Sequence, residues 1–370
     1  MQNEFLPEYP CTCDMWDELA KECRPILVYG MGNGADKLIR RLAEYDVDIS
    51  DVFASDGFVR GHSFHGIRVK SFSEVKELYN DFVIVLSFGT KREQVLDMLS
   101  AMDREYDMYV PDMPVANEEE YFDREFYNTH YDEIKKAYDR LSDERSKKAF
   151  SSILHYKISG RMKYLEEGYD SDEEIYSLIS PLAPKSVIDG GAYDGDSLIE
   201  MRKYLPSILR AIAVEPDCKT FKKLLKNTSF LDGFDIKLYN AALWSSSGVG
   251  RFSASANRNS TVVATASYEY KEDAVELVSV DGIADGAVDY IKYDVEGAEA
   301  IAISGSLSVI SRYSPALRIA IYHRSCDVFS IINYMSDRFS DYDYYIRRKR
   351  CLPAWEIDLI MIPRRIQNEK

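Results

Sequence analysis

Residues 186–198 read Ser-Val-Ile-Asp-Gly-Gly-Ala-Tyr-Asp-Gly-Asp-Ser-Leu. The apolar pair Val187 and Ile188 predicts a buried strand that ends in Asp189, and a helix is expected to begin near Ser197. The glycines between them let the backbone approach a ligand closely and adopt positive φ. A turn for a pyrophosphate would instead have a glycine and free N–H groups where Asp189 stands. The stretch therefore predicts a strand–turn–helix unit for a ligand that is cationic or carries hydroxyl groups.

Two later segments place more carboxylates at strand ends. Residues 212–217, Ile-Ala-Val-Glu-Pro-Asp, predict a strand that ends in Glu215, 26 positions after Asp189. A carboxylate at about this spacing holds a ribose diol in other open sheets. Residues 290–299, Tyr-Ile-Lys-Tyr-Asp-Val-Glu-Gly-Ala-Glu, predict a third strand followed by three carboxylates, Asp294, Glu296 and Glu299. Because ligands bind at the carboxyl ends of parallel strands, these acids indicate one shared site. The acid at the first turn favours S-adenosylmethionine over a dinucleotide there.

These segments resemble those of FkbM-type methyltransferases over residues 184–363. The matching stretches are residues 187–192, 213–217, 240–243, 278–281, 294–299 and 321–324. The resemblance implies an α/β class I methyltransferase fold that uses S-adenosylmethionine for O-methylation, often of sugars or polyketide-like hydroxyls, and hence a role in polysaccharide biosynthesis. One departure from the common turn is Tyr193, which stands where a middle glycine is usual and is a candidate to pack over the amino-acid half of the cofactor.

The resemblance and the strand-end positions together give the candidate site. The cofactor-binding residues are Asp189, Gly190, Gly191, Ala192, Tyr193, Gly195, Glu215, Pro216, Asn240, Ala241 and Asp294. The catalytic candidates are His323 and Asp294, and the substrate-binding candidates are Glu296, Glu299 and Arg324. The acceptor is expected to be a small molecule or a glycan.

The proposed chemistry explains the choice of catalytic residues. Methyl transfer from a sulfonium is an in-line displacement, and a sugar hydroxyl gains from a base that removes its proton. His323 is expected beside Asp294, and an imidazole with its ordinary pKa of about 6.5 is a neutral base near pH 7. Asp294 is the alternative base, and a purely structural His323 is also compatible. Glu296 and Glu299 either bind the acceptor or stabilise the next helix by interacting with the positive end of its dipole. No metal is predicted, because the three carboxylates after residue 293 show no further ligand for a divalent cation.

A second α/β pattern begins at residue 26. Residues 26–35, Ile-Leu-Val-Tyr-Gly-Met-Gly-Asn-Gly-Ala, predict a buried strand and a turn that matches the alanine form of the dinucleotide fingerprint. Asp56 ends the next strand, 26 residues after Gly30. Residues 55–69 resemble part of the amino-terminal Rossmann-like domain of bacterial sugar O-acyltransferases, which implies a second nucleotide site at Gly30, Gly32, Gly34 and Asp56. A structural or substrate-presenting domain is the favoured alternative.

The chain is expected to divide into three parts. Residues 1–115 are the smaller Rossmann-like domain, residues 116–180 form a charged helical bridge, and residues 181–370 are the methyltransferase domain. The basic run 347–350 is interpreted as a solvated hairpin edge, with a clamp for a substrate phosphate or carboxylate as the alternative.

Composition limits the partners. A net charge of -16 argues against nucleic acid, whose phosphates it would repel. No apolar run reaches the roughly 20 residues of a membrane span, and Glu4 and Glu8 stand where a signal peptide would be basic. Cys11-x-Cys13 lacks the second half of a zinc site, so free thiols and a cytoplasmic location are expected. A homo-oligomer is compatible with the sequence.

Three function classes fit these patterns. A methyltransferase acting on a glycan, glycolipid precursor or nucleotide-sugar is favoured. A nucleotide-sugar oxidoreductase is the second class, and Tyr131-x-x-x-Lys135 has the required spacing but falls in the helical bridge. The third is a non-catalytic binding protein with a relict cofactor site, which the intact acids Asp189, Glu215 and Asp294 disfavour.

Overall fold

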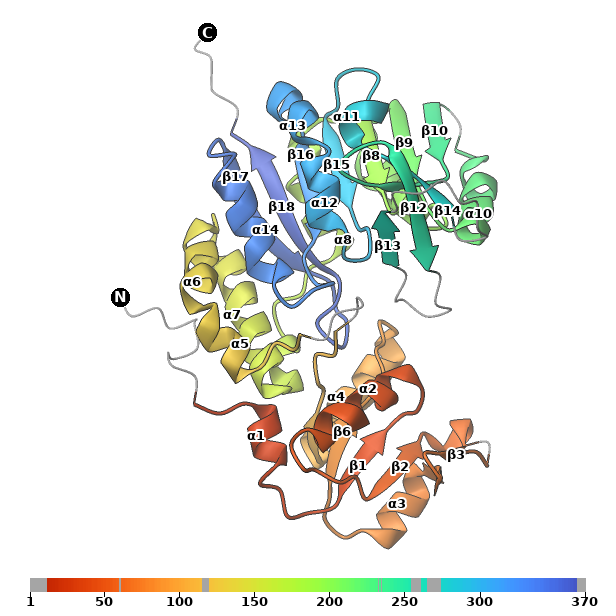
Figure 1. Ribbon diagram of the computed structural model, residues 1–370, viewed down its shortest axis with the longest axis vertical. Coiled ribbons are helices and arrows are strands. Elements are labelled where there is room, and N and C mark those ends of the chain that lie inside the picture. Colours follow the sequence, from red (N-terminus) through yellow and green to blue (C-terminus); the bar gives the residue numbers. More distant parts are fainter. Residues whose placement is uncertain are drawn as a thin grey trace.

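Two α/β domains, each built on one main sheet, lie one above the other in Figure 1, with a group of helices along one side of the upper domain. The computed structural model describes residues 12–59, 61–114, 120–231, 233, 235–253, 261–264 and 274–364. Cys11 lies outside the described residues. The cysteines within the described residues form no disulfide: Cys13, Cys23, Cys218, Cys326 and Cys351. Among the described residues, no helix has the length and apolar character needed to cross a bilayer.

The first domain is a parallel sheet of five strands in the order β5-β2-β1-β6-β7. Its strands are β1 Ile26–Tyr29, β2 Asp51–Ala54, β5 Lys70–Ser71, β6 Val83–Leu86 and β7 Asp107–Tyr109. Its other elements are α1 Met15–Leu19, α2 Asn33–Ala43, η1 Asp56–Phe58, the strand pair β3 Ser63–Phe64 and β4 Ile67–Arg68, α3 Phe72–Leu78 and α4 Glu93–Glu105. Every residue of β1, β2 and β6 is buried, as expected of a sheet covered on both faces, and Asp51 is the one charged residue among them.

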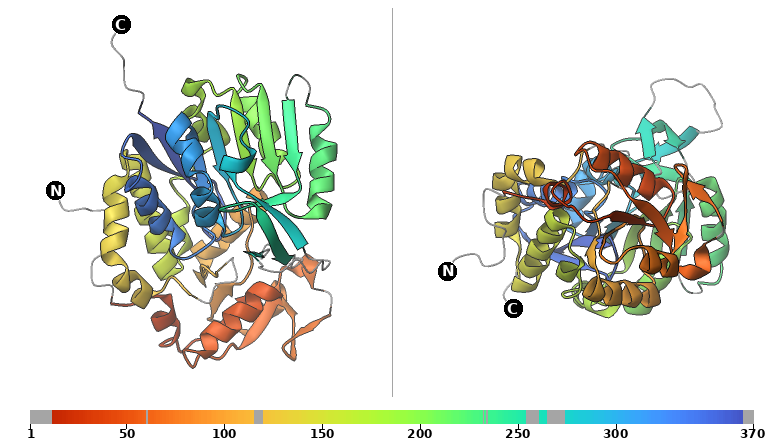
Figure 2. Two further views of the ribbon diagram at one scale, coloured as in Figure 1. Left: turned by 45° about the horizontal axis from the view of Figure 1, so that its top comes forward. Right: turned by 90° about the horizontal axis from the view of Figure 1, so that it is seen from below.

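The helical bridge packs against the second domain. It comprises α5 Arg124–Thr129, α6 Tyr131–Arg140, α7 Glu144–Ser159, η2 Met162–Leu165, α8 Asp172–Ser177 and η3 Ser180–Leu182. In Figure 1 and the left view of Figure 2, α5, α6 and α7 lie beside α14 Asp327–Ser336 and β17 Tyr342–Arg348. The backbone N–H of Ser142 donates to the Tyr344 carbonyl at 2.8 Å, and the Ile346 N–H donates to Ser146 Oγ at 2.9 Å. The bridge therefore extends the core of the second domain along β17.

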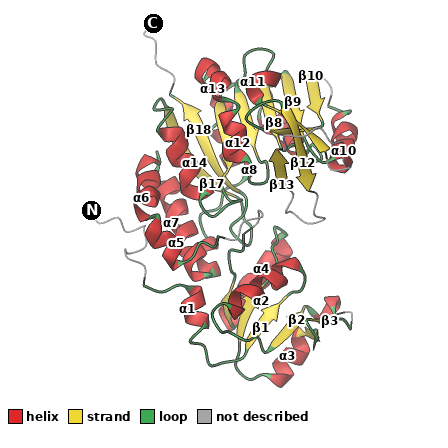
Figure 3. Ribbon diagram, viewed as in Figure 1, coloured by secondary structure: helices red, strands yellow, loops and turns green. Residues whose placement is uncertain are grey.

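The second domain holds a seven-stranded sheet in the order β10-β9-β8-β15-β16-β18-β17, with helices beside its strands (Figure 3). Its remaining strands are β8 Ser186–Gly190, β9 Arg210–Val214, β10 Asp235–Tyr239, β15 Tyr290–Tyr293, β16 Ala316–Ala320 and β18 Ile357–Pro363. The first five strands in this order, β10, β9, β8, β15 and β16, are parallel, and β18 runs antiparallel to both of its neighbours. The strand order reverses between β8 and β15, and ligands of open α/β sheets bind at the carboxyl ends around such a switch point.

Helices and a small sheet complete the second domain. The helices are α9 Asp196–Tyr204, α10 Cys218–Thr228, α11 Val280–Ile283, α12 Glu299–Ser304 and α13 Leu307–Tyr313. The small sheet has the order β11-β14-β12-β13, formed by β11 Ala241–Leu243, β12 Gly248–Ser253, β13 Thr261–Ala264 and β14 Ala274–Val278.

The loop between β17 and β18 docks on the first domain. Thr90 and Leu352 exchange two backbone hydrogen bonds, of 2.7 and 3.0 Å, and the Arg350 guanidinium pairs with Glu93 and Asp97 of α4. Gly89 is required at this contact, because a Cβ there would lie 2.3 Å from the Trp355 ring. The loop thus ties the two domains together.

The interpretation of the basic run as a solvated hairpin edge is wrong. Arg347 and Arg348 are buried, since Arg347 pairs with Asp143 and the Arg348 guanidinium donates to carbonyls at residues 165 and 167. Lys349 pairs with Asp172 and Glu200, and Arg350 pairs with helix α4 as described above. A substrate clamp is not supported either, because all four cations already have partners within the chain.

Candidate active site

The turn after β8 is shaped by its close contact with the end of β15. At Gly191, φ is +76°, and a Cβ would lie only 1.9 Å from the backbone oxygen of Asp294. The Asp294 N–H in turn donates to the Gly190 carbonyl at 3.0 Å. Any other residue at 191 would be strained and would overlap backbone that is fixed by strand pairing. The glycine therefore brings the first and third predicted strand ends together.

Asp189 is completely buried beneath this turn. One carboxylate oxygen accepts from the Ser197 hydroxyl of α9, and the other lies 3.7 Å from the Lys292 Nζ of β15. Burial raises the pKa of Asp189, although Lys292 and Ser197 act against that increase. The carboxylate therefore fixes the turn from below, and a direct contact with a ligand would have to come from the backbone above it.

Glu215 lies where the second strand ends and closes the turn from the other side. One of its oxygens accepts from the Tyr193 N–H at 3.0 Å, and the other accepts from the Asp217 N–H at 2.8 Å. Burial raises the pKa of Glu215 to about 7, against the effect of these two hydrogen bonds. Asn240 Nδ2 donates to the carbonyls of Glu215 and Pro216 at 2.9 and 3.1 Å. The carboxylate is thus held in place with lone pairs left for a diol.

The other predicted cofactor residues surround the same turn. Tyr193 has φ of +48° and is 55% exposed, so its ring stands out from the surface above the turn. Gly195 is the N-cap of α9, while the side chains of Ala192 and Ala241 are fully buried. A Cβ at Gly190 would lie 2.4 Å from the Leu243 side chain, so that glycine is needed for packing.

Asp294 follows β15 directly and is 32% exposed. Its Oδ2 lies 3.3 Å from the Lys292 Nζ, and its Oδ1 accepts from the Tyr322 hydroxyl at 3.2 Å. Burial opposes ionisation, but Lys292 and His323 lower the pKa of Asp294 to about 2. The group is therefore a permanent negative charge at the switch point.

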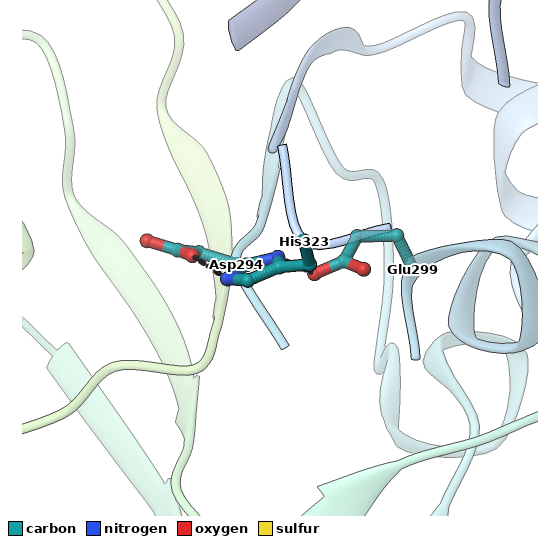
Figure 4. Close-up of side chains that lie close together, drawn as sticks. All are labelled: Asp294, Glu299 and His323. Atoms are coloured by element: carbon teal, nitrogen blue, oxygen red, sulfur yellow. Dashed lines mark ion pairs between the residues drawn. The ribbon is translucent and has the colours of Figure 1, made fainter. Parts of the chain in front are cut away.

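His323 lies three residues beyond the end of β16, the strand that pairs with β15, so the predicted closeness to Asp294 is confirmed. The ring is 1% exposed and lies between Asp294 and Glu299 (Figure 4). Nδ1 is 2.9 Å from Glu299 Oε1, whereas Nε2 is 3.7 Å from Asp294 Oδ1 and 3.5 Å from Glu296 Oε2. Three carboxylates from the segment 294–299 thus face one imidazole.

The charge of His323 differs from the expected neutral imidazole. Burial disfavours the charged ring, but Glu299, then Asp294 and Glu296, outweigh it and raise the pKa to about 10. The ring is consequently protonated at neutral pH in the ligand-free protein. The sequence showed His323 and the acids separately, but not that three carboxylates would converge on one ring.

The substrate-binding candidates lie on the outer side of His323. Glu296 has φ of +55° and its side chain is 44% exposed, while the Arg324 Nε donates to the Gly297 carbonyl at 2.8 Å. Glu299 is buried at the start of α12, where its Oε1 accepts from the Val295 N–H at 2.8 Å. Glu299 therefore acts inside the protein, and Glu296 and Arg324 are the candidates that face outward.

The first domain does not repeat this arrangement. The Asp56 carboxylate accepts from the backbone N–H and the hydroxyl of Ser73, at 3.1 and 2.5 Å, and so fixes the start of α3. Gly34 is a packing residue, because a Cβ there would lie 2.1 Å from the Ser87 carbonyl oxygen. Gly32 has φ of +109° and open space around it, whereas a Cβ at Gly30 would meet the Ser87 side chain. A nucleotide at this turn stays a prediction.

Two charged residues beside the candidate site escaped the sequence analysis. Lys292 stands between Asp189 and Asp294, and both acids hold the pKa of its buried ammonium above its ordinary value against the effect of burial. Asp327 is buried near the imidazole, and burial followed by the Glu299 charge raises its pKa to about 8. A single lysine inside the apolar run 290–293 was the available signal for the first. Asp327 had no signal beyond its position at the start of a helix.

The sheet order, the glycine turn and the acids at the switch point define a class I methyltransferase fold. Residues 189–346, just under half of the chain, match the family model described as the methyltransferase FkbM domain. Residues 189–346 thus match the FkbM methyltransferase domain, and the protein is an enzyme of the S-adenosylmethionine-dependent methyltransferase class.

Solved structures extend the comparison of folds. The crystal structure of an FkbM methyltransferase from Methylobacillus flagellatus superposes with a TM-score of 0.68 at 17% identity, covering 98% of this chain and 96% of that one. The shared fold therefore includes the first domain. An rRNA methylase from Streptococcus thermophilus reaches a TM-score of 0.36 at 10% identity over 52% of this chain and 96% of its own. That similarity is too low to support an inference. No curated protein matches the chain.

Proposed function

We propose that this protein binds S-adenosylmethionine across the carboxyl ends of β8, β9 and β15 and methylates a sugar hydroxyl. The acceptor would belong to a glycan, a glycolipid precursor or a nucleotide-sugar. The observation that carries the proposal is the Glu215 carboxylate, whose two oxygens are held by backbone N–H groups beside the glycine turn. Such a fixed carboxylate is suited to accept hydrogen bonds from the two hydroxyls of a ribose. The ribose is a part of the cofactor that does not react, and binding it positions the methyl group.

The rest of the cofactor would follow the turn toward the switch point. The backbone around Gly191 and Tyr193 would contact its amino-acid half, and Asn240 and Ala241 would lie beside its base. Asp294 supports this direction, because a carboxylate with a pKa of about 2 offers a full negative charge to a cationic ligand. The Coulomb attraction between a sulfonium or ammonium group and this acid would be strong in a partly buried site.

The acceptor would lie on the side of Asp294 that carries His323, Glu296 and Arg324. Charged and hydrogen-bonding groups dominate this side, and they suit a molecule with several hydroxyls better than an apolar one. In the transfer, the hydroxyl oxygen forms a bond to the methyl carbon while the carbon–sulfur bond breaks, and its electron pair stays on sulfur. Because His323 is protonated in the ligand-free protein, it can accept the hydroxyl proton only after added positive charge offsets the acids around it.

Calorimetric titration of the full chain with S-adenosylmethionine tests the cofactor half of the proposal. NAD and UDP-sugars in parallel titrations test the oxidoreductase alternative. Transfer of labelled methyl groups from the cofactor to a panel of nucleotide-sugars and oligosaccharides tests the acceptor half. Tight binding of NAD without binding of S-adenosylmethionine would contradict the proposal. Binding of S-adenosylmethionine without methyl transfer to any hydroxylated acceptor would contradict the acceptor half and leave only the cofactor half.

A further inference from the structure

The contacts of His323 are unusual for a buried histidine. Nε2 makes no hydrogen bond with the residues that the structure describes, and Nδ1 lies 2.9 Å from the Glu299 carboxylate, although the ring is 1% exposed. Unpaired polar atoms at such depth are costly. One ligand atom each from Asp294, Glu299 and His323 can be chosen so that all three lie within 4.8 Å of one another. The cluster combines an imidazole with carboxylates, and these are common ligands of divalent transition metals.

The distances on the outer side of the ring suit a cation better than a hydrogen bond. Nε2 lies 3.7 Å from Asp294 Oδ1 and 3.5 Å from Glu296 Oε2, which is too long for good hydrogen bonds. Ligand atoms that surround one metal ion at about 2.1 Å are separated from one another by about 3.0–3.5 Å. The distances from Nε2 to the two carboxylate oxygens are therefore close to those between ligands of one ion, which the flexible Asp294 and Glu296 side chains would complete by small movements. Asp294 and Glu296 are partly exposed, so an ion could enter from that side.

The inner side of the ring has the support that metal-binding histidines require. Nδ1 lies 2.9 Å from Glu299 Oε1, and that oxygen is fixed in turn by the Val295 N–H at 2.8 Å. Histidines that bind metals through one nitrogen usually direct the other to a carboxylate or carbonyl, which sets the tautomer and the orientation of the ring. Glu299 occupies the place of that carboxylate.

We propose that Asp294, Glu296 and the Nε2 atom of His323 hold a divalent transition metal ion, and that Glu299 orients the ring. One nitrogen and two carboxylate ligands favour an ion such as Mn²⁺, with coordination positions left for oxygens of an acceptor. The role of such an ion in catalysis rests on the proposed function, whereas its binding does not. A hydroxyl bound to it would lose its proton to solvent more readily, as metal-bound water does.

Manganese binding to the full-length protein tests this site without reference to activity. Titration with Mn²⁺ alone, followed by the loss of the free-ion electron paramagnetic resonance signal, should give one bound ion per chain. Spin-echo modulation should show an imidazole nitrogen coupled to that ion. Glu296→Gln, whose side chain is partly exposed, and His323→Ala should each weaken binding at least 10-fold, and Glu299→Gln should weaken it about 10–100-fold.

The matched control is His65→Ala, which removes an exposed imidazole that lies 2.7 Å from the carboxylate of Asp36 in the first domain. It should leave the bound ion, its affinity and the nitrogen coupling unchanged. Failure of the wild-type protein to bind Mn²⁺, or equal binding by Glu296→Gln and wild type, would overturn the proposed metal site. Calorimetry with S-adenosylmethionine on the same sample separates the two proposals, since the proposed function requires that binding with or without the ion.

Discussion

The two α/β domains begin with the same signal and use it differently. In each, a glycine turn follows a buried strand, and an acid lies near the end of the next strand. Asp56 comes 26 positions after Gly30, the first glycine of its turn, and Glu215 comes 26 positions after Asp189, which precedes its turn. Asp56 accepts two hydrogen bonds from Ser73 and fixes a helix start. Glu215 accepts from the N–H of Tyr193, within the glycine turn itself, and from that of Asp217 just beyond the strand. The second acid is thus bonded to the glycine turn of its own domain, and the first is bonded to a helix start.

The difference lies in what the acid meets after the strand ends. Ser73 is the second residue of α3 and reaches Asp56 because β5, the strand before that helix, lies beside β2. In the second domain β10 lies beside β9, and Asn240 after it holds the backbone at Glu215. Spacing along the chain places both acids near strand ends, but the neighbouring strand decides whether the acid bonds to a helix start or to the glycine turn.

The largest contrast between the two domains is expected at their histidines. His323→Ala should lower methyl transfer by about 10²–10⁴-fold, because the residue meets the proposed acceptor hydroxyl or holds the ion that binds it. His65→Ala, the matched change in the first domain, should leave the rate unchanged. The measurement is single-turnover transfer of labelled methyl groups at saturating cofactor. Normal turnover in His323→Ala would move the catalytic role to Asp294.

The two turns should differ in their tolerance of a Cβ. Gly191→Ala and Gly32→Ala both place alanine at positive φ, which costs about 1–3 kcal/mol. Gly191→Ala also drives a Cβ into the Asp294 backbone, whereas Gly32→Ala meets nothing within 4 Å. We expect Gly191→Ala to lower the free energy of unfolding by about 1–3 kcal/mol more than Gly32→Ala, as measured by urea denaturation. Equal losses would show that the contact with Asp294 relaxes easily.

Much of the fold could be predicted because apolar runs and glycine turns are local signals. The strands at 186–190, 210–214 and 290–293 and the α/β character of both domains follow from such runs. The position of the bridge along β17 could not be predicted, because it depends on pairs such as Arg347 with Asp143, which lie far apart in the chain. The basic run was misinterpreted for the same reason: its charge was visible in the sequence, and its partners were not.

The acids of the two domains should differ in their effect on the cofactor. Glu215→Ala removes a buried carboxylate that we expect to bind the ribose, and it should weaken S-adenosylmethionine binding about 10–150-fold. Asp56→Ala should leave that affinity unchanged, because Asp56 is bonded to Ser73 in the other domain. Calorimetry on both folded variants makes the comparison. Equal affinities for Glu215→Ala and wild type would remove the ribose assignment.

The positions of the site residues could be predicted, because each of them lies at or just beyond the end of a strand that the sequence indicates. Asp189, Glu215, Asp294 and His323 do lie around the carboxyl ends of β8, β9 and β15, but their roles depend on three-dimensional surroundings. Asp189 is sealed beneath the turn by Lys292 and Ser197, and His323 is surrounded by carboxylates. Burial and charge at these positions arise from strands that the chain brings together over about a hundred residues.

The smallest expected effect concerns pH and also depends on Glu215. Its pKa in the ligand-free protein is raised to about 7, so it takes up a proton as the pH falls through 7, and the neutral acid must ionise before it can accept from both ribose hydroxyls. The affinity for S-adenosylmethionine should therefore be constant above pH 8 and fall as the pH drops, approaching tenfold per unit well below pH 7. Asp294, with a pKa of about 2, stays ionised throughout and adds no slope in this range. Glu215→Gln should bind more weakly at pH 8 and show a flatter profile. A wild-type affinity that is constant from pH 8 to pH 5.5 would mean that Glu215 does not need its charge to hold the cofactor, and the contrast with Asp56 would then rest on hydrogen bonds alone.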